Sequence, residues 1–224
     1  MKKVSFAEMK KSEDFINLSE GNKKLKPNNR VKFLIFNLPS IKTCPYATDN
    51  CKSLCYARKA EKTYPNCIKA RKRNFEATKK DDFVDRMIFT ILAYLGKPSY
   101  RTAETVVIRI HESGDFYNKE YVNKWLQISE FFADYPKVVF VAYTKSIRFF
   151  DGVTIPNNMV VRFSLWDDTK EEEKELAEKM GLPIYSAVEH FTNEPNRNRC
   201  FCLDCGTCSK CWNKSIDLLL CEIH

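Results

Sequence analysis

The stretch TVVIRIHESGDFYNKEYVNKWLQISEFF, residues 105–132, contains one complete strand, turn and helix. The apolar run Thr105 to Ile110 is typical of a buried strand, and Ser113 to Asp115 form a turn around a glycine. The residues after the turn repeat large apolar side chains at helical spacing, namely Tyr121, Trp125, Ile128 and Phe132. This stretch therefore predicts a strand that leads, through a polar turn, into an amphipathic helix.

The same unit recurs along the chain. Apolar runs predict further strands at residues 31–38, 137–143, 159–165 and 184–188, and helical patterns lie between them at 67–77, 83–95, 146–150 and 169–180. About five alternations of strand and helix imply parallel strands joined by right-handed crossovers. We expect an α/β fold of about five parallel βα units, either an open sheet or a partial barrel. Its ligand site should lie at the carboxyl ends of the strands.

Length and composition fit a soluble globular protein. The 224 residues are 44% hydrophobic and 29% charged, enough for one sizeable core. We expect an α/β domain over residues 1–190 and a Cys-rich extension over residues 191–224 that packs on it. The chain has no apolar run suited to a signal peptide or a bilayer span, which predicts a cytoplasmic protein without membrane contact. Because the cytoplasm keeps thiols reduced, the ten cysteines indicate metal ligands or catalytic thiols.

The second cysteine group reads CFCLDCGTCSKC, residues 200–211. Cys202, Cys205, Cys208 and Cys211 are each separated by two residues, and Cys200 upstream is a substitute ligand. A run of C-x2-C steps wraps thiolates around a cubic cluster, so this spacing predicts a [4Fe-4S] cluster. Zinc is the alternative, since it also binds four thiolates, although its sites usually use two pairs separated by a longer loop.

The first cysteine group follows the first predicted strand in TCPYATDNCKSLCYARK, residues 43–59. Cys44, Cys51 and Cys55 would leave one metal position open for a ligand, as catalytic metal sites do. Two alternatives remain: Cys67 completes a closed four-cysteine site, or these cysteines are packing residues.

Polar residues follow the next three predicted strands and should share one rim with the first cysteine group. The candidate catalytic residues are His111, Glu112, Asp115 and Lys145. The candidate residues for binding a small ligand or cofactor are Ser113, Gly114, Tyr143, Thr144 and Ser164. The alternative for Asp115 is a cap on the following helix. Arg109 and Arg162 lie in apolar strands, so each requires an anionic ligand or a salt bridge to an acidic residue.

The formal net charge is +8, with clusters at Lys23, Lys24 and Lys26 and at Lys69 to Arg73. Such an excess can mark a phosphate-bearing partner such as nucleic acid, but it is more often a solvated helix face.

Five motifs resemble the phage gene product eighty-eight family, in order, from about residue 37 to 212. They are TCPYATDNCKSLCYARK, RIHESGDF, AYTKS, RFSLWDDT and CGTCSKCW. The chain is more weakly similar to radical S-adenosylmethionine enzymes, which carry a three-cysteine cluster after the first strand of a partial barrel. Here C-x6-C-x3-C replaces their C-x3-C-x2-C. This similarity implies a small iron-sulfur enzyme with S-adenosylmethionine as cofactor and Ser113 to Asp115 as its glycine-rich binding segment. The alternative function is a zinc- or cluster-stabilised protein that binds nucleic acid during phage or plasmid replication.

Overall fold

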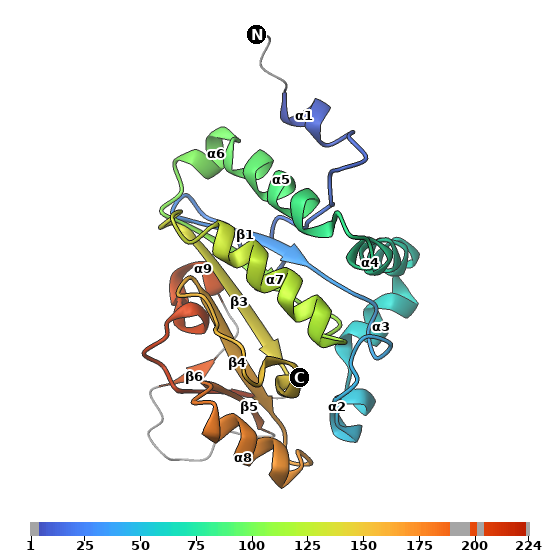
Figure 1. Cartoon of the computed structure of the whole chain (residues 1–224), viewed down its shortest axis with the longest axis vertical. Coiled ribbons are helices and arrows are strands. Elements are labelled where there is room, and N and C mark those ends of the chain that lie inside the picture. The colour runs from blue at the N-terminus through green and yellow to red at the C-terminus, as the bar shows by residue number, and fades with distance from the viewer. Residues whose placement is uncertain (1–4, 189–197, 201–203, 223–224) are drawn as a thin grey trace.

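A curled parallel sheet forms the centre of the protein (Figure 1). The computed structural model describes residues 5–188, 198–200 and 204–222. Within them the sheet has seven strands in the order β1-β2-β3-β4-β5-β7-β6, and every neighbouring pair is parallel. The strands are β1 (Val31–Phe36), β2 (Thr105–Ile110), β3 (Val138–Thr144), β4 (Met159–Leu165), β5 (Ile184–Val188), β6 (Arg199–Cys200) and β7 (Leu218–Glu222). The predicted α/β half-barrel is confirmed.

Helices or helical turns are present at every predicted position, and the structure adds helices before residue 65, at Pro98–Arg101 and at Cys205–Cys208 that were not predicted. The α-helices are α1 (Phe6–Met9), α2 (Asp49–Ser53), α3 (Tyr56–Thr63), α4 (Pro65–Thr78), α5 (Phe83–Leu95), α6 (Pro98–Arg101), α7 (Lys119–Phe131), α8 (Glu171–Lys179) and α9 (Cys205–Cys208). Two 3-10 turns are η1 (Ile147–Phe150) and η2 (Lys210–Trp212). Helix α4 begins earlier than predicted because Pro65 occupies its first turn, where a proline ring fits. None of the helices that the structure describes is long and apolar enough to cross a membrane.

Helices α5 and α7 cover the outer face of the first three strands. Trp125 of α7 is fully buried, with its ring 5.5 Å from Phe36 and 6.4 Å from Phe140. Phe83 of α5 packs beside it, 6.0 Å from the same indole. Burying one such side chain contributes roughly 1.5–3 kcal/mol. The aligned aromatic residues seen in the sequence therefore form the main core.

The opposite, inner face of the sheet is covered by the Cys-rich extension. Phe33, Val107, Val141 and Val160 form a small apolar cluster there, and Cys205, Cys211 and Trp212 pack against it. The Trp212 ring lies 5.9 Å from Phe33.

Part of the extension also enters the sheet itself. Strands β6 and β7 continue the sheet beyond β5, so it has seven described strands instead of the five expected. The extension is thus integrated into the fold, while the expected boundary at residues 190 and 191 lies outside the described residues.

Candidate metal centre

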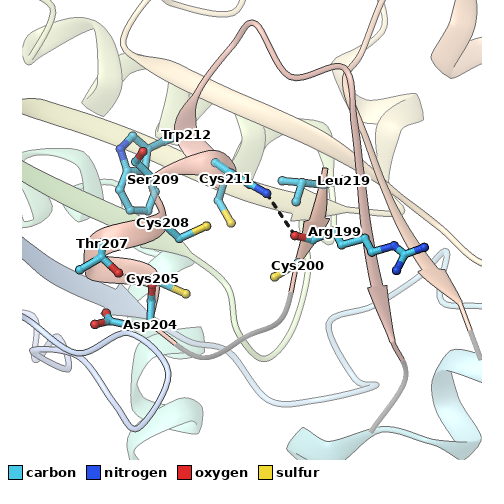
Figure 2. A pocket seen from close by; sticks show the side chains of 11 residues that line it. Arg199, Cys200, Asp204, Cys205, Thr207, Cys208, Ser209, Cys211, Trp212 and Leu219 are labelled. Carbon is cyan, nitrogen blue, oxygen red and sulfur yellow. Dashed lines mark hydrogen bonds between the residues drawn. The ribbon is translucent and has the colours of Figure 1, made fainter. Parts of the chain in front are cut away.

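Four cysteines from the extension line one cavity of about 220 Å³. Cys205 and Cys208 belong to α9, Cys211 to η2 and Cys200 to β6. Figure 2 shows the four sulfur atoms directed toward a common space. Cys202, which the spacing also predicts as a ligand, lies outside the described residues. The cavity therefore places the substitute ligand Cys200 beside three of the expected four.

Two local features shape the turn that carries these cysteines. The Asp204 carboxylate caps α9 by accepting a hydrogen bond from the Gly206 amide at 2.9 Å. A Cβ at Gly206 would lie 2.7 Å from the Lys26 carbonyl oxygen, so only glycine allows this close approach. Ser209 then adopts a left-handed conformation, with φ 54°, that ends α9 and redirects the chain into η2. Short turns of this kind bring Cys208 and Cys211 to the same cavity.

Arg162 of β4 fastens this segment to the inner face. Its side chain is fully buried and donates hydrogen bonds to four backbone carbonyls. The acceptors are Cys211 at 2.8 Å, Ile216 at 2.7 Å, Asn213 at 2.9 Å and Lys210 at 3.1 Å. The sequence predicted that an arginine in an apolar strand requires partners, and Arg162 has them. These partners are backbone carbonyl groups of the extension. Among the residues that the structure describes, Arg162 forms no salt bridge with an acidic side chain.

Arg109 and Tyr143 extend this polar cluster across the inner face. The Arg109 guanidinium stacks 3.7 Å from the centre of the Tyr143 ring, which itself lies 4.5 Å from the Tyr185 ring. The Tyr143 hydroxyl lies near the Cys211 thiol. Nη1 of Arg109 is buried and has no hydrogen-bond partner within the described residues. A cation thus lies close to the thiols.

Two of the thiols at this cavity, Cys205 and Cys211, are protonated at neutral pH in the absence of a metal. Burial raises the pKa of Cys205 to about 12 and also raises that of Cys211, although Arg109 opposes both shifts. Metal binding would therefore release protons. Among residues 5–188, 198–200 and 204–222, no three His, Cys, Asp or Glu side chains are already grouped closely enough to hold a metal ion. The donor set suits a metal centre, and the thiols lie farther apart than the ligands of a single metal ion.

The first cysteine group lies where the topology predicts. Cys44 follows β1, Cys51 belongs to α2, and Cys55 occupies the position before α3. Burial raises the pKa of Cys44 to about 12, and Asp115 and the two other thiols add to this shift as neighbouring charges. The structure therefore brings Cys44 near Asp115, at the carboxyl ends of the strands.

The other rim residues are joined by hydrogen bonds. Asp115 accepts from the Thr144 hydroxyl at 2.6 Å and from the Lys145 amide at 2.9 Å. The Lys145 ammonium lies 3.0 Å from the Ser164 hydroxyl. The alternative role of Asp115 as a helix cap is wrong, because Asn118 caps α7 by accepting from the Tyr121 amide at 2.8 Å. Asp115 instead links the β2 and β3 loops.

The turn that contains His111 packs into the fold. His111 has a positive φ of 65°, and its Nε2 lies 2.8 Å from the Tyr121 hydroxyl in the outer core. Burial, helped by Arg109, lowers the pKa of His111 to about 3, so the ring is neutral at physiological pH. The Ser113 hydroxyl donates to the Leu38 carbonyl at 2.9 Å. This geometry favours packing roles for both residues.

Glu112 points to a different part of the rim. Its backbone carbonyl accepts a hydrogen bond from the Tyr56 hydroxyl, and its carboxylate accepts one from Asn22. Its amide, with that of Ser113, donates to the Asn37 side chain at 2.7 and 3.0 Å. Sequence reasoning missed Asn37; its place directly after β1 was the available signal.

The fold and the site together define a class: parallel α/β half-barrel proteins whose inner face carries a cysteine-lined cavity. The family model for Gene product 88 matches residues 16–205, and the chain belongs to that family. Similar proteins include the Gene 88 proteins of Mycobacterium phage L5, 32% identical over 105 residues, and Mycobacterium phage D29, 31% identical over 105 residues. Each match covers 46% of this chain and 43% or 42% of the relative, less than half of the relative's length. No solved structure matches the chain.

Proposed function

We propose that this Gene product 88 family protein is an iron-sulfur protein whose cluster is held by Cys200, Cys205, Cys208 and Cys211. The observation that carries the proposal is the convergence of four thiols, from three separate elements, on one cavity. Thiolates are the ligands of iron-sulfur clusters, and short C-x2-C steps are typical of them.

The size of the cavity favours a cluster over a single zinc ion. Tetrahedral zinc, with Zn–S bonds of about 2.3 Å, would hold its sulfur atoms only about 4 Å apart. The four thiols and seven further residues line a cavity of about 220 Å³, which has room for a group of several atoms. Arg199 and Lys210 also line the cavity, and Arg109 lies close to Cys205 and Cys211. These cations would offset the negative charge of four thiolates.

We further propose a second centre at Cys44, Cys51 and Cys55, with one coordination position open to a small ligand. Its support is the position of Cys44 beside Asp115, on the rim that also carries Lys145 and Ser164. The radical enzyme resemblance makes S-adenosylmethionine the candidate ligand, and a cluster at this place would supply the electron for its cleavage. The Lys145 ammonium and the Ser164 hydroxyl are suited to bind the carboxylate of such a ligand.

Anaerobic purification tests both centres. We expect a brown protein with broad visible absorption that contains iron and acid-labile sulfide. Cys205→Ser should remove the iron of the inner-face centre, and Cys51→Ser that of the rim centre, so each variant retains part of the iron. Cys67→Ser is the matched control and should retain all of it.

Two results would contradict these proposals. A colourless protein with stoichiometric zinc would refute the iron-sulfur assignment and support the alternative, a zinc-stabilised protein. Full iron content in Cys51→Ser, together with loss of iron in Cys205→Ser, would refute the rim centre alone. The proposed role of S-adenosylmethionine would then be refuted as well.

A further inference from the structure

The positive charge of the chain is concentrated in one short segment. Residues 52–80 contain ten Lys or Arg and two Glu, a net charge of +8, which equals the formal charge of the whole chain. All other residues together have no net charge. The segment consists of α3 and α4 with their flanking residues, which lie together at the carboxyl end of β1 (Figure 1). The charge therefore belongs to one place on the surface.

The cations of this segment face solvent and are mostly unpaired. Seven of them are exposed and have no ion-pair partner among the residues that the structure describes, and six of these seven lie on α3 and α4. We call these six the α3–α4 basic face: Arg58, Lys59, Lys62, Lys69, Lys72 and Arg73. On α4, Lys69, Lys72 and Arg73 are spaced by three and four residues, so they lie on one side of the helix. A helix face that is merely solvated usually carries acidic residues among its basic ones. The α3–α4 basic face has few acidic residues near it.

A buried ion pair holds the two helices together beneath the basic face. Arg71 of α4 donates hydrogen bonds to the Ala57 carbonyl at 3.0 Å and to the Glu61 carboxylate at 2.9 Å, both in α3. Glu61 in turn accepts from the backbone amide of Ser40 at 2.8 Å. The one cation that faces inward is thus used for structure, and the exposed cations sit on a fixed scaffold.

Two exposed tyrosines lie at the ends of α3. Tyr56, its first residue, is 62% exposed, and Tyr64, directly after its last residue, is 63% exposed. The Tyr56 hydroxyl is hydrogen-bonded to the Glu112 carbonyl, so the ring is held in place while much of it stays in solvent. A tyrosine ring beside cations provides a surface on which a base can stack.

We propose that the α3–α4 basic face, with Tyr56 and Tyr64, binds single-stranded nucleic acid. The cations would contact backbone phosphates and the tyrosine rings would stack on unpaired bases, which a duplex does not expose. This site is independent of the proposed metal centres, although Cys55 directly precedes Tyr56. Binding there would bring a strand to the rim that carries Asp115 and Lys145.

The test measures binding of the full, metal-loaded protein to fluorescent single-stranded DNA and RNA oligonucleotides over a range of salt concentrations. The triple variant Lys69→Gln, Lys72→Gln and Arg73→Gln should weaken binding at least tenfold. The logarithm of the association constant falls linearly with the logarithm of the salt concentration. Loss of three phosphate contacts should make this slope less steep by about 2. Tyr64→Ala should weaken binding by on the order of tenfold with an unchanged salt slope, whereas Tyr64→Phe should bind normally.

A matched control removes the same number of charges elsewhere. Lys23→Gln, Lys24→Gln and Lys26→Gln alter exposed lysines of another segment and should leave affinity and salt slope unchanged. Equal weakening in this control would overturn the proposal, because it would show an effect of net charge alone. Equal affinity for duplex DNA, with Tyr64→Ala binding normally, would overturn it as well, as would the absence of binding to any oligonucleotide. Unchanged circular dichroism and metal content in each variant would confirm that the fold is intact.

Discussion

Arg162 should be the side chain that secures the inner layer, and replacing it with Met tests this directly. Methionine keeps much of the apolar volume of arginine but donates no hydrogen bonds. The change would leave four buried carbonyls of the segment from Lys210 to Ile216 without their present donor. We therefore expect the cysteine-rich segment to loosen from the sheet.

The size of the effect follows from these hydrogen bonds. Each bond from a charged donor contributes about 1.5–3 kcal/mol. Four such contributions overstate the loss, because Arg162→Met also removes the cost of burying a guanidinium. Removing one partner of a buried charged group typically costs about 3–5 kcal/mol, which is the loss we expect in the free energy of unfolding. For a chain of this size it corresponds to a fall in Tm of roughly 6–20 °C.

Urea unfolding followed by circular dichroism and tryptophan fluorescence measures this loss. Trp212, one of three tryptophans, lies within the segment, so part of the fluorescence signal should change at a lower urea concentration than the helical signal. Arg148→Met is the matched control, because Arg148 is 44% exposed and pairs with Glu172 and Glu173 on the surface. We expect it to cost less than about 1 kcal/mol. An Arg162→Met variant no less stable than this control would refute the assigned role.

Three further changes test other parts of the fold. Burial alone would raise the pKa of Glu61, but hydrogen bonds from Ser40 and Arg71 outweigh it and lower that pKa below 4.5. Its charged form therefore stabilises the protein above pH 4.5, and chemical denaturation should show that Glu61→Gln costs about 1–3 kcal/mol at neutral pH and less at lower pH. Because His111 has a folded pKa of about 3 against 6.5, its protonation favours the unfolded state. His111→Phe should thus lose less stability than wild type as the pH falls from 6.5 to 3; equal losses would contradict the placement of this ring. Gly114→Ala should cost more than about 2 kcal/mol in thermal unfolding, since Gly114 has a φ of 83° and a Cβ would lie 2.6 Å from two side chains. The control Gly181→Ala also has a positive φ but meets no atom within 4 Å, so it should cost less.

The first five strands were predictable from sequence because each is a run of apolar residues that ends at polar or turn residues. All five match the structure to within two residues. Strands β6 and β7 were not predicted. Strand β6 has two residues, and β7 pairs with β5 across the whole cysteine-rich extension. Such pairing depends on where the extension packs, which local sequence patterns do not encode.

The candidate rim was predictable as a set of loops, whereas the directions of its side chains were not. Parallel strands bring their carboxyl ends together, so Asp115, Thr144, Lys145 and Ser164 do lie close to one another. The positive φ of His111 turns its ring toward the outer core. Positive φ is uncommon for any residue other than glycine, and the enrichment of histidine there is too weak to predict it at one position, so only the structure revealed it.

The need to cover the inner face of the sheet explains why the proposed metal centre would lie beside Arg109 and Arg162. A half-barrel leaves this face open, and its apolar cluster of Phe33, Val107, Val141 and Val160 must be covered. The covering segment has few apolar residues of its own, since it is made largely of cysteines, short turns and Trp212. Arg162 binds its carbonyls, and Arg109 lies near its thiols, but neither replaces a hydrophobic core. The proposed cluster would supply the missing cohesion by cross-linking Cys200 of the sheet to Cys205, Cys208 and Cys211. Removal of the metal should therefore loosen the inner layer first, while the outer layer around Trp125 retains its packing.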